Sequence, residues 1–303
     1  MTKDLPASKM LKILTPKDIR VLYMVETLLK KGEYAPVEQI ATYTGYHLKD
    51  VTIRLDRLHK LKLVKRWQGY FIGYTLTFAG YDTLALNALN NQKKVYALGS
   101  NRGVGKESDL YYAIDFDDKE VLLKINRTGR MSFQQIRRKR DFLDNKRHFS
   151  VFFLAEMSAS REYEILKKLG EANLPVPKVY GYNRHIIVME IIEGVELIQM
   201  RELPNPEKII EQIVNFAKTL YHDYGIIHGD LTEFNMMYNP DTDKITFFDF
   251  PQIIDTSHPD AKDILTRDIS HIIDFFTKKY KVGADVNSVI SYILGEKYTE
   301  NDR

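Results

Sequence analysis

Apolar positions in residues 15–32 recur every three to four residues, which predicts an amphipathic helix. Thr15 is a suitable N-cap, Pro16 fits the first helical position, and Gly32 provides a stop. The buried face of this helix is predicted to carry Ile19, Leu22, Tyr23, Val25, Leu28 and Leu29.

Two further helices and a strand pair follow the first helix. A short helix is predicted over residues 36–45 and a longer one over 47–64, and residues 65–80 then alternate as in two strands joined by a turn. The apolar face of the third helix is predicted to contain Val51, Leu55, Leu58 and Leu61. With a closing helix over 81–92, this order resembles a winged-helix domain, and we assign it to residues 1–91.

Positive charge is concentrated in this first domain. Residues 1–91 carry 14 Lys and Arg against 8 Asp and Glu, whereas the remaining residues carry 30 against 33. The third helix and its exit supply a series of these cations, which is typical of a phosphate-contacting recognition helix: Lys49, Arg54, Arg57, Lys60, Lys62, Lys65 and Arg66. A solvated helix that serves protein contacts is the alternative, and the choice between RNA and DNA stays open.

The composition indicates a globular intracellular protein. The 303 residues are 44% hydrophobic and include no cysteine, which excludes disulfides, thiolate metal sites and thiol nucleophiles. We find neither a signal peptide nor an apolar run long enough to span a membrane. We therefore expect a cytoplasmic protein without a membrane partner.

The glycines that follow the first domain suggest a nucleotide site. A Walker loop would need a glycine at Ser100, a Ser or Thr at Glu107 and a helix afterwards, but the residues from 108 onward alternate like strands. The alternative is the hairpin lid of kinases, in which a loop covers the nucleotide. The candidate nucleotide-binding residues of this loop are Gly103, Val104, Gly105, Lys106, Glu107 and Ser108.

The second strand after this loop contains a lysine among apolar residues. Lys124 is expected to contact the α- and β-phosphates, since a buried lysine is unfavourable without partners. Its partner should come from a helix downstream, where Glu162 is favoured over Glu164. A linker then follows whose backbone would bind the adenine edge, so Met189, Glu190 and Ile192 are added as nucleotide-binding candidates.

A second constellation lies in the last third of the chain. Residues 228–235 place Asp230 five positions before Asn235, which is the spacing of the kinase catalytic loop, where the aspartate faces the phosphoryl acceptor and the asparagine holds a metal ion. Asp249 ends a strand at the place of the metal-binding aspartate of kinases. The order of glycine-rich loop, lysine, aspartate, asparagine and aspartate along the chain is specific to a kinase-type phosphoryl-transfer site.

With these motifs in place, the sequence resembles the RIO family of atypical serine/threonine protein kinases over nearly its whole length. The stretches "GVGKESDLY", "HGDLTEFN", "DFPQ" and "TSHPDA" carry the likeness, and the winged helix points to the second-type branch. The resemblance implies an α+β fold, with a trimmed two-lobed kinase domain over 92–303 (N-lobe 92–189, C-lobe 194–303).

The resemblance also implies an ATPase and kinase that uses ATP with Mg²⁺ (or Mn²⁺) and acts in maturation of the small ribosomal subunit. By position, Lys124 contacts phosphate, Asp230 is catalytic, and Asn235 and Asp249 hold metal. In the family the position of Asp249 can also receive the phosphoryl group as an aspartyl-phosphate.

Three departures from ordinary kinases bear on the reaction. Gly229 replaces the arginine that senses a phosphorylated activation loop, and Pro251 replaces the glycine of D-F-G and should discourage its flip. Asp268, which we interpret as the anchor of the next large helix, follows Asp249 too closely for a long activation segment. Phosphoryl transfer to water through an enzyme intermediate is therefore plausible.

The partners follow from the two basic regions. Residues 127–147 contain eight Lys and Arg against two Asp, and this segment and the winged helix are expected to contact a small-subunit precursor or its ribosomal RNA. Two alternatives remain: a conventional protein kinase with a free protein substrate, and a nucleotide-binding RNA- or DNA-binding assembly factor without turnover.

Overall fold

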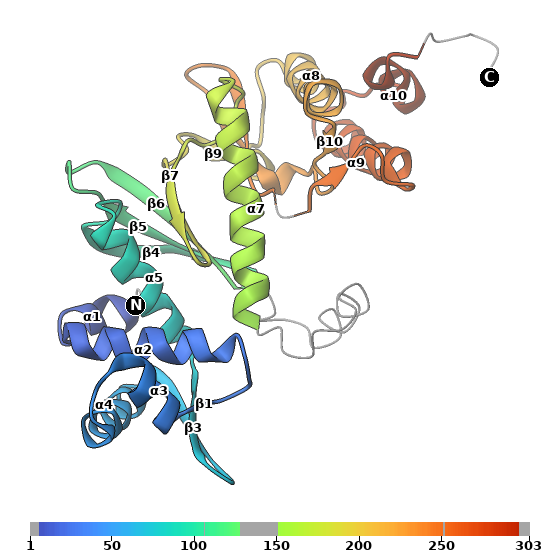
Figure 1. The fold of residues 1–303 in the computed structure, drawn as a ribbon. Helices are drawn as coiled ribbons and strands as arrows, with labels where there is room; N and C mark the ends of the chain where they lie inside the picture. The colour runs from blue at the N-terminus through green and yellow to red at the C-terminus, as the bar shows by residue number, and fades with distance from the viewer. Residues whose placement is uncertain (1–5, 106, 128–150, 251, 297–303) are drawn as a thin grey trace. The chain divides into compact units, whose positions relative to one another are not determined.

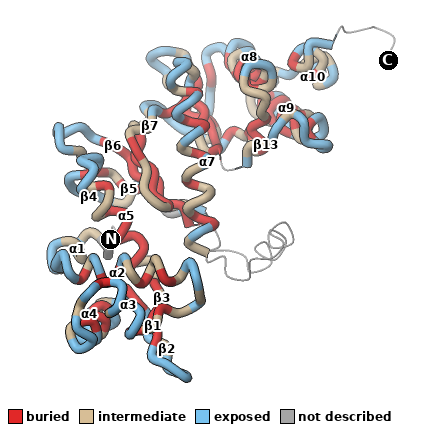
Figure 2. Tube along the Cα trace, in the orientation of Figure 1, coloured by how far each residue is buried: buried red, intermediate tan, exposed pale blue. Residues whose placement is uncertain are grey.

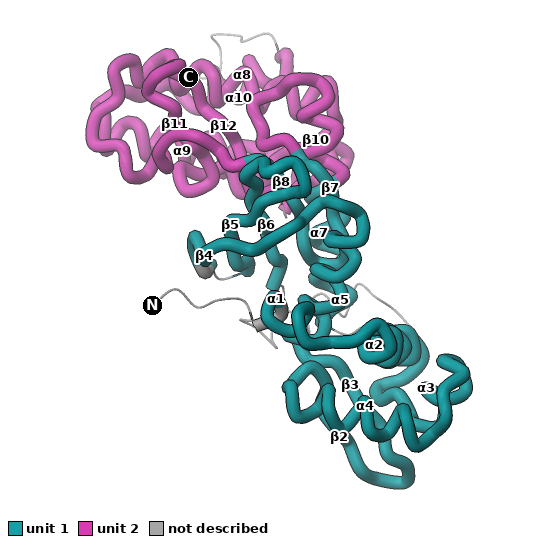
Figure 3. The backbone as a smooth tube through the Cα atoms, turned by 90° about the vertical axis from the view of Figure 1, so that its left-hand side faces the viewer, with its two compact units in different colours: residues 1–163, 179–190 teal, residues 164–178, 191–303 magenta. Residues whose placement is uncertain are grey.

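The computed structural model describes residues 6–105, 107–127, 151–250 and 252–296. These form two compact units, one of residues 1–163 with 179–190 and one of residues 164–178 with 191–303 (Figure 3). Within the described ranges, no helix is both long and apolar enough to cross a membrane.

The first unit begins with the predicted helices and strand pair (Figure 1). Its elements are α1 (Pro6–Leu11), α2 (Pro16–Leu29), β1 (Ala35–Pro36), α3 (Val37–Thr44), α4 (Leu48–Lys60), β2 (Val64–Gln68), β3 (Ile72–Leu76) and α5 (Phe78–Asn91). Helix α2 starts with a capping box, because the Thr15 hydroxyl accepts from the Asp18 N–H while the Asp18 carboxylate accepts from the Thr15 N–H.

The winged-helix core contains most of the predicted apolar positions. Val51, Leu55 and Leu58 of α4 are fully buried, as are Leu22 and Val25 of α2. The prediction was wrong for Tyr23, which is 51% exposed, because the neighbouring position Val21 occupies the buried face instead.

The rest of the first unit is an antiparallel sheet of five strands in the order β4-β5-β6-β8-β7. Its elements are β4 (Ala97–Val104), β5 (Ser108–Ile114), β6 (Glu120–Asn126), β7 (Val179–Asn183) and β8 (Ile186–Met189), and α7 (Val151–Glu171) contributes its residues up to Tyr163 to the same unit. The turn before β6 places Asp118 at φ 58°, a left-handed conformation that aspartate tolerates in turns.

Helix α5 is shared between the winged helix and this sheet. Tyr81 and Leu84 belong to the winged-helix core, whereas the next turns of the same helix pack against the sheet with Ala85, Leu86 and Leu89. Along β5 the residues facing α5 are buried and those on the other face are only partly buried, and Figure 2 shows the buried positions along α5. At β5 the sheet is therefore covered on its α5 face and partly open on the other, whereas most residues of β6 and β8 are buried on both faces.

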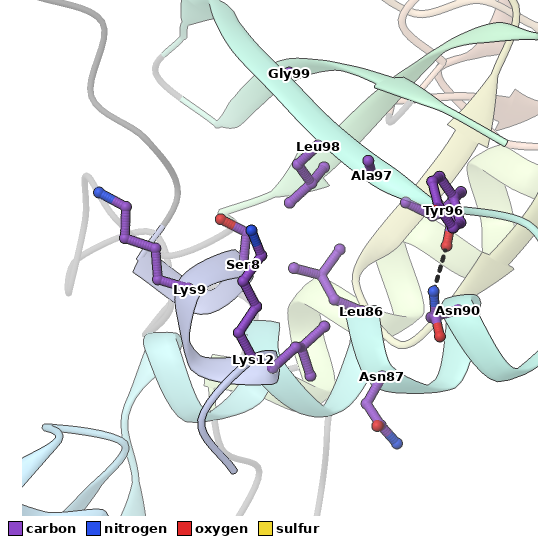
Figure 4. A pocket seen from close by; sticks show the side chains of 12 residues that line it. Ser8, Lys9, Lys12, Leu86, Asn87, Asn90, Tyr96, Ala97, Leu98 and Gly99 are labelled. Atoms are coloured by element: carbon purple, nitrogen blue, oxygen red, sulfur yellow. Dashed lines mark hydrogen bonds between the residues drawn. The ribbon is translucent and has the colours of Figure 1, made fainter. Parts of the chain in front are cut away.

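A pocket of about 450 Å³ lies where α1, α5 and β4 meet (Figure 4). Its wall includes Lys9, Lys12 and Tyr96, and the Asn90 side-chain amide donates to the Val95 carbonyl at its edge. None of the nucleotide-binding candidates lines it, so this pocket is separate from the predicted site.

The second unit is mainly helical with two small antiparallel sheets, in the orders β12-β11-β9 and β10-β13. Its elements are β9 (Val195–Glu196), η1 (Leu197–Gln199), α8 (Pro206–Tyr224), β10 (Ile226–Ile227), η2 (Glu233–Asn235), β11 (Met236–Asn239), β12 (Lys244–Phe247), β13 (Ile254–Asp255), α9 (Ala261–Tyr280) and α10 (Val286–Leu294). Helix α8 ends at Gly225, which has the left-handed conformation common at helix C-termini.

Candidate active site

The glycine-rich segment forms the turn of a hairpin. Strands β4 and β5 are antiparallel, with Gly103 opposite Leu110, and the Gly105 N–H donates to the Ser108 carbonyl at 2.7 Å. The segment leads into a strand rather than a helix, which excludes the Walker loop and matches the kinase lid.

Parts of this loop lie outside the described residues. Lys106 is one of them, and of Val104 only the backbone is described. Gly105 and Glu107 are exposed and Ser108 is half-buried, so the described loop residues are accessible to a ligand.

Lys124 and Glu162 form a buried ion pair in the first unit. The Lys124 Nζ lies 2.5 Å from Glu162 Oε1, and their side chains are 8% and 1% exposed. Glu164, the other candidate, is exposed. The pairing removes the cost of a lone buried ammonium group and holds Lys124 in one position.

The adenine-side candidates begin on β8. Met189 is 4% exposed and lies opposite Leu122 of β6, two register positions along the strands from the Lys124–Ile187 pair. Glu190 follows at the end of the first unit, and Ile192 belongs to the second unit. Each candidate is thus placed within its own unit.

The catalytic-loop candidates lie together in the second unit. Asp230 is half-buried, and the Asn235 side-chain amide donates to the Asp230 carbonyl at 2.8 Å and to its Oδ2 at 3.1 Å. Because the amide nitrogen of Asn235 faces Asp230, its oxygen faces the other side, as a cation ligand would.

Gly229 has a structural reason to replace the usual arginine. Its φ is +79°, and a Cβ built on it would lie 2.3 Å from the Gln252 carbonyl oxygen. A side chain is therefore excluded both by the backbone conformation and by the space. Pro251, to which we assigned a restraint on the D-F-G flip, lies outside the described residues.

Asp249 is brought next to Asn235 by a β-hairpin. Strands β11 and β12 pair with Met236 opposite Phe247, and the Phe248 N–H donates to the Asn235 carbonyl at 3.0 Å. Asp249 itself has φ +67°, a left-handed conformation that costs about 1–3 kcal/mol for a residue with a side chain. The hairpin therefore places Asp249 and Asn235 at the same end of the β11–β12 pair.

These two residues suit a magnesium ion that also binds phosphate. Mg²⁺ prefers oxygen ligands and is commonly held by one or two carboxylates, water and substrate phosphates. The described residues contain no cluster of three or more His, Cys, Asp or Glu fit for a metal ion. An amide oxygen from Asn235 and a carboxylate from Asp249 would leave the other ligand positions of such a cation to phosphate oxygens and water.

Asp268 supports the catalytic loop from α9. Its buried carboxylate accepts from the Arg267 guanidinium at 2.8 Å, and the same guanidinium donates to the carbonyl of Gly229, next to Asp230. Burial raises the pKa of Asp268, and Arg267 and the backbone donors partly oppose this effect. The sequence analysis interpreted Asp268 only as an anchor of this helix. It did not predict the link to the catalytic loop through Arg267, because sequence spacing does not show which loop lies next to a residue in the middle of a helix.

The recognition-helix candidates divide into two groups. Arg54 and Arg57 both bind the buried carboxylate of Asp18, at 2.8 and 2.9 Å, whereas Lys49 and Lys60 are exposed. The sequence did not predict that two members of the phosphate-contacting series pair with a buried anion of α2, which needs their charge. The Arg57 side chain nevertheless stays 44% exposed.

The wing carries aromatic residues as well as exposed cations. Trp67 stacks on Tyr34 with ring centroids 4.9 Å apart and lies 5.1 Å from Phe71. Gly69 and Gly73 leave room for these rings, since a Cβ on Gly69 would lie 2.1 Å from the Trp67 ring. Lys62, Lys65, Arg66 and Tyr70 are exposed around them.

Comparison with known proteins shows which family has these motifs. A RIO domain profile matches residues 109–289, and a profile of the N-terminal domain of Rio2 matches residues 11–92. The chain belongs to the RIO family. The RIO match contains Lys124, Asp230, Asn235 and Asp249, and the predicted family and the α+β fold with a winged helix are confirmed.

Relatives within the RIO family align with most of this chain. It is 38% identical to serine/threonine-protein kinase rio2 of Dictyostelium discoideum, over 90% of this chain and 52% of that protein. It is 36% identical to RIO-type serine/threonine-protein kinase Rio2 of Methanocaldococcus jannaschii, over 88% of this chain and 99% of that protein. The chain thus spans about half the length of the first relative and nearly all of the second.

A solved structure of the RIO family has the same fold. The Rio2 kinase–ADP/Mg²⁺–phosphoaspartate complex from Chaetomium thermophilum superposes with a TM-score of 0.83 at 31% identity, covering 94% of this chain and 88% of that one.

Proposed function

We propose that this chain is an ATP-dependent RIO-type serine/threonine protein kinase and ATPase. The observation that carries the proposal is that the residues of the kinase site are positioned in their units: Lys124 is paired with Glu162, and Asp230 with Asn235. The complex of the Chaetomium thermophilum relative with ADP and Mg²⁺ supports ATP and Mg²⁺ as the ligands.

Each candidate residue then has a distinct task. Lys124 holds the α- and β-phosphates, Asp230 orients the group that accepts the phosphoryl group, and Asn235 and Asp249 hold the cation. When bound, Mg²⁺ offsets the negative charge of the phosphates. Positioning and charge stabilisation supply most of the rate in such transfers.

We further propose that Asp249 accepts the phosphoryl group. One of its carboxylate oxygens bonds to the γ-phosphorus as the bond from that phosphorus to the β,γ-bridging oxygen breaks, and ADP leaves with the bond's electrons. Water then attacks the acyl phosphate, which releases inorganic phosphate and restores the carboxylate. The phosphoaspartate in the solved relative supports this route.

Single-turnover labelling tests the activity and the acceptor together. With [γ-³²P]ATP, the purified protein should acquire label that hydroxylamine removes, and Asp249→Ala should lose it. Hydroxylamine-sensitive label in Asp249→Ala would place the acceptor elsewhere. Binding of ATP without release of phosphate would favour a non-turnover assembly factor, and transfer mainly to an added protein would favour a conventional kinase.

We propose that the partner is a precursor of the small ribosomal subunit, contacted through its RNA, in the cytoplasm. The exposed cations of α4 and the wing support an RNA contact, and the stacked wing aromatics suit unpaired bases. The segment 127–147 was expected to contribute, but residues 128–147 lie outside the described residues. Arg127, its first cation, is buried and paired with Asp82 and Asp109, so it does not belong to this surface.

Salt dependence tests the RNA contact. Replacing Lys49 and Lys60 with Gln should lower the log–log slope of RNA affinity against salt by about 0.7 for each phosphate that is no longer neutralised, because each lysine releases a condensed counterion on binding. The matched control replaces Lys262 and Lys278, two exposed lysines of the second unit, and should leave the slope unchanged. Equal slopes in all three proteins would sink the proposed RNA interaction.

A further inference from the structure

Four buried polar side chains meet behind the nucleotide-site candidates. The Arg127 guanidinium binds both carboxylate oxygens of Asp82, at 2.6 and 2.9 Å, and its Nε lies 2.8 Å from Asp109 Oδ2. The His185 Nε2 lies 2.7 Å from Asp82 Oδ1. All four residues are at most 5% exposed, so this cluster is sealed from solvent.

The members of the cluster come from four different elements of the first unit. Asp82 lies on α5, Asp109 is the second residue of β5, and His185 lies in the turn between β7 and β8. Arg127 directly follows β6, and its backbone N–H donates to the carbonyl of Glu107 in the glycine-rich loop at 2.6 Å. Arg127 thus holds the loop end with its backbone and the following strand with its side chain.

Arg127, directly after β6, has its side chain on the opposite face from Lys124 of that strand. Lys124 turns toward Glu162 of α7, whereas Leu123 and Ile125 join the apolar core shared with α5. Side chains alternate along a strand, so Arg127, three positions after Lys124, reaches Asp82 on the α5 side. Any shift of Arg127 is therefore transmitted along β6 to the phosphate-binding lysine.

Stability alone does not account for such a cluster. Buried ion pairs can often be replaced by apolar residues with little loss, since desolvation opposes their attraction. What an arginine adds is geometry: its planar fork binds a carboxylate in one orientation, which a flexible lysine does not reproduce. The cluster fixes α5, the start of β5 and the end of β6 in one arrangement.

We propose that Arg127 is a positioning residue for the nucleotide phosphates, and that Asp82 makes α5 of the winged-helix domain part of the nucleotide site. The inference rests on the proposed function, because it requires that ATP binds between the glycine-rich loop and Lys124. Arg127 sets the distance between these two elements, while neither Arg127 nor Asp82 touches the reacting atoms.

Arg127→Lys tests the inference, because it keeps the charge and removes the fork. We expect the KM for ATP to rise roughly 10- to 100-fold, the scale on which small misplacements act, with a smaller change in kcat. The matched control is Arg184→Lys. Arg184 binds Glu26 of α2 through two nitrogens at 2.6 Å and so also joins the winged helix to the sheet, but none of its described hydrogen bonds reaches β5 or β6. The control should keep its KM within about twofold.

The outcomes separate three cases. No ATP binding by the unmodified protein overturns both the proposed function and this inference. ATP binding that is equally affected by Arg127→Lys and Arg184→Lys, in step with their unfolding temperatures, overturns the inference alone and leaves a structural cluster. If Arg127→Lys fails to fold, Asp109→Asn decides: it keeps the Arg127–Asp82 pair and loosens only β5, and an unchanged KM for ATP in that variant overturns the inference.

Discussion

The two sets of candidate catalytic residues are held in place by different means. In the first unit, Lys124 and Glu162 neutralise each other inside a regular sheet-and-helix environment. In the second unit, Asp230 and Asp249 are half-buried loop residues, held by Asn235 and by backbone contacts, and Arg267 of α9 donates to the carbonyl beside Asp230. This difference supports our proposal that the first set holds the nucleotide in a fixed place, whereas the second set faces the phosphoryl group that is transferred.

The largest effect is expected in the second set. Asp230→Asn should lower phosphate release by about 100- to 10,000-fold, because a positioned catalytic carboxylate contributes on this scale, while ATP affinity stays within a few fold. Single-turnover phosphate release and equilibrium ATP titration measure the two quantities. A parallel loss of affinity and turnover would contradict the division between the two sets.

In the first set, substitutions should affect the free energy of unfolding and the affinity for ATP separately. Lys124→Met breaks the buried ion pair with Glu162, and breaking a buried pair costs about 3–5 kcal/mol. Lys124→Met combined with Glu162→Leu should recover most of that stability but none of the ATP affinity, since the phosphate contact is still missing. Urea unfolding and ATP titration of both variants provide the check, and recovery of ATP binding in the double variant would show that Lys124 has only a structural role.

The smallest effect concerns how folding stability depends on pH, and it arises in the first unit, at His185. Burial lowers the pKa of His185 from 6.5, and Arg127 and Arg184 act in the same direction although Asp82 opposes them. The unfolded chain therefore binds a proton that the folded one does not, so stability should fall as the pH decreases below about 6.5. The pKa of Asp82 is also lowered, from 3.8, so this carboxylate adds its own loss only in more acidic solution.

His185→Gln is the matched variant, because the Gln amide can replace Nε2 as a donor to Asp82 without titrating. Urea midpoints at pH 7 and pH 5 should differ less in His185→Gln than in the unmodified protein. The same pH dependence in both would assign the effect to other groups.

Local motifs predicted much of this structure, and long-range contacts explain what they missed. Asn235 and Asp249 were predictable because their spacing belongs to a short loop and a hairpin. Asp18 was not, since a capping-box aspartate looks like a surface residue until α4 places Arg54 and Arg57 beside it.

The same limit applies to charge patterns. Arg127 begins a strongly basic segment and was assigned to a partner-binding surface, yet it is buried against Asp82 and Asp109. A run of cations gives no sign of which member has a distant anionic partner. The prediction that Tyr23 is buried was wrong for a similar reason. Helical spacing shows that α2 has an apolar face, but it does not show which residues at the edge of that face are buried.

Helix α5 makes the stability of the winged-helix domain and that of the RIO domain depend on each other. One helix completes the winged-helix core with Tyr81 and Leu84 and covers the sheet with Ala85, Leu86 and Leu89. A fragment that starts at residue 92 would bare that apolar face and leave Arg127 without Asp82. The RIO domain of this chain therefore depends on a helix of the preceding domain. A recombination event that replaced the winged helix would have to keep α5 or supply another element that covers the sheet.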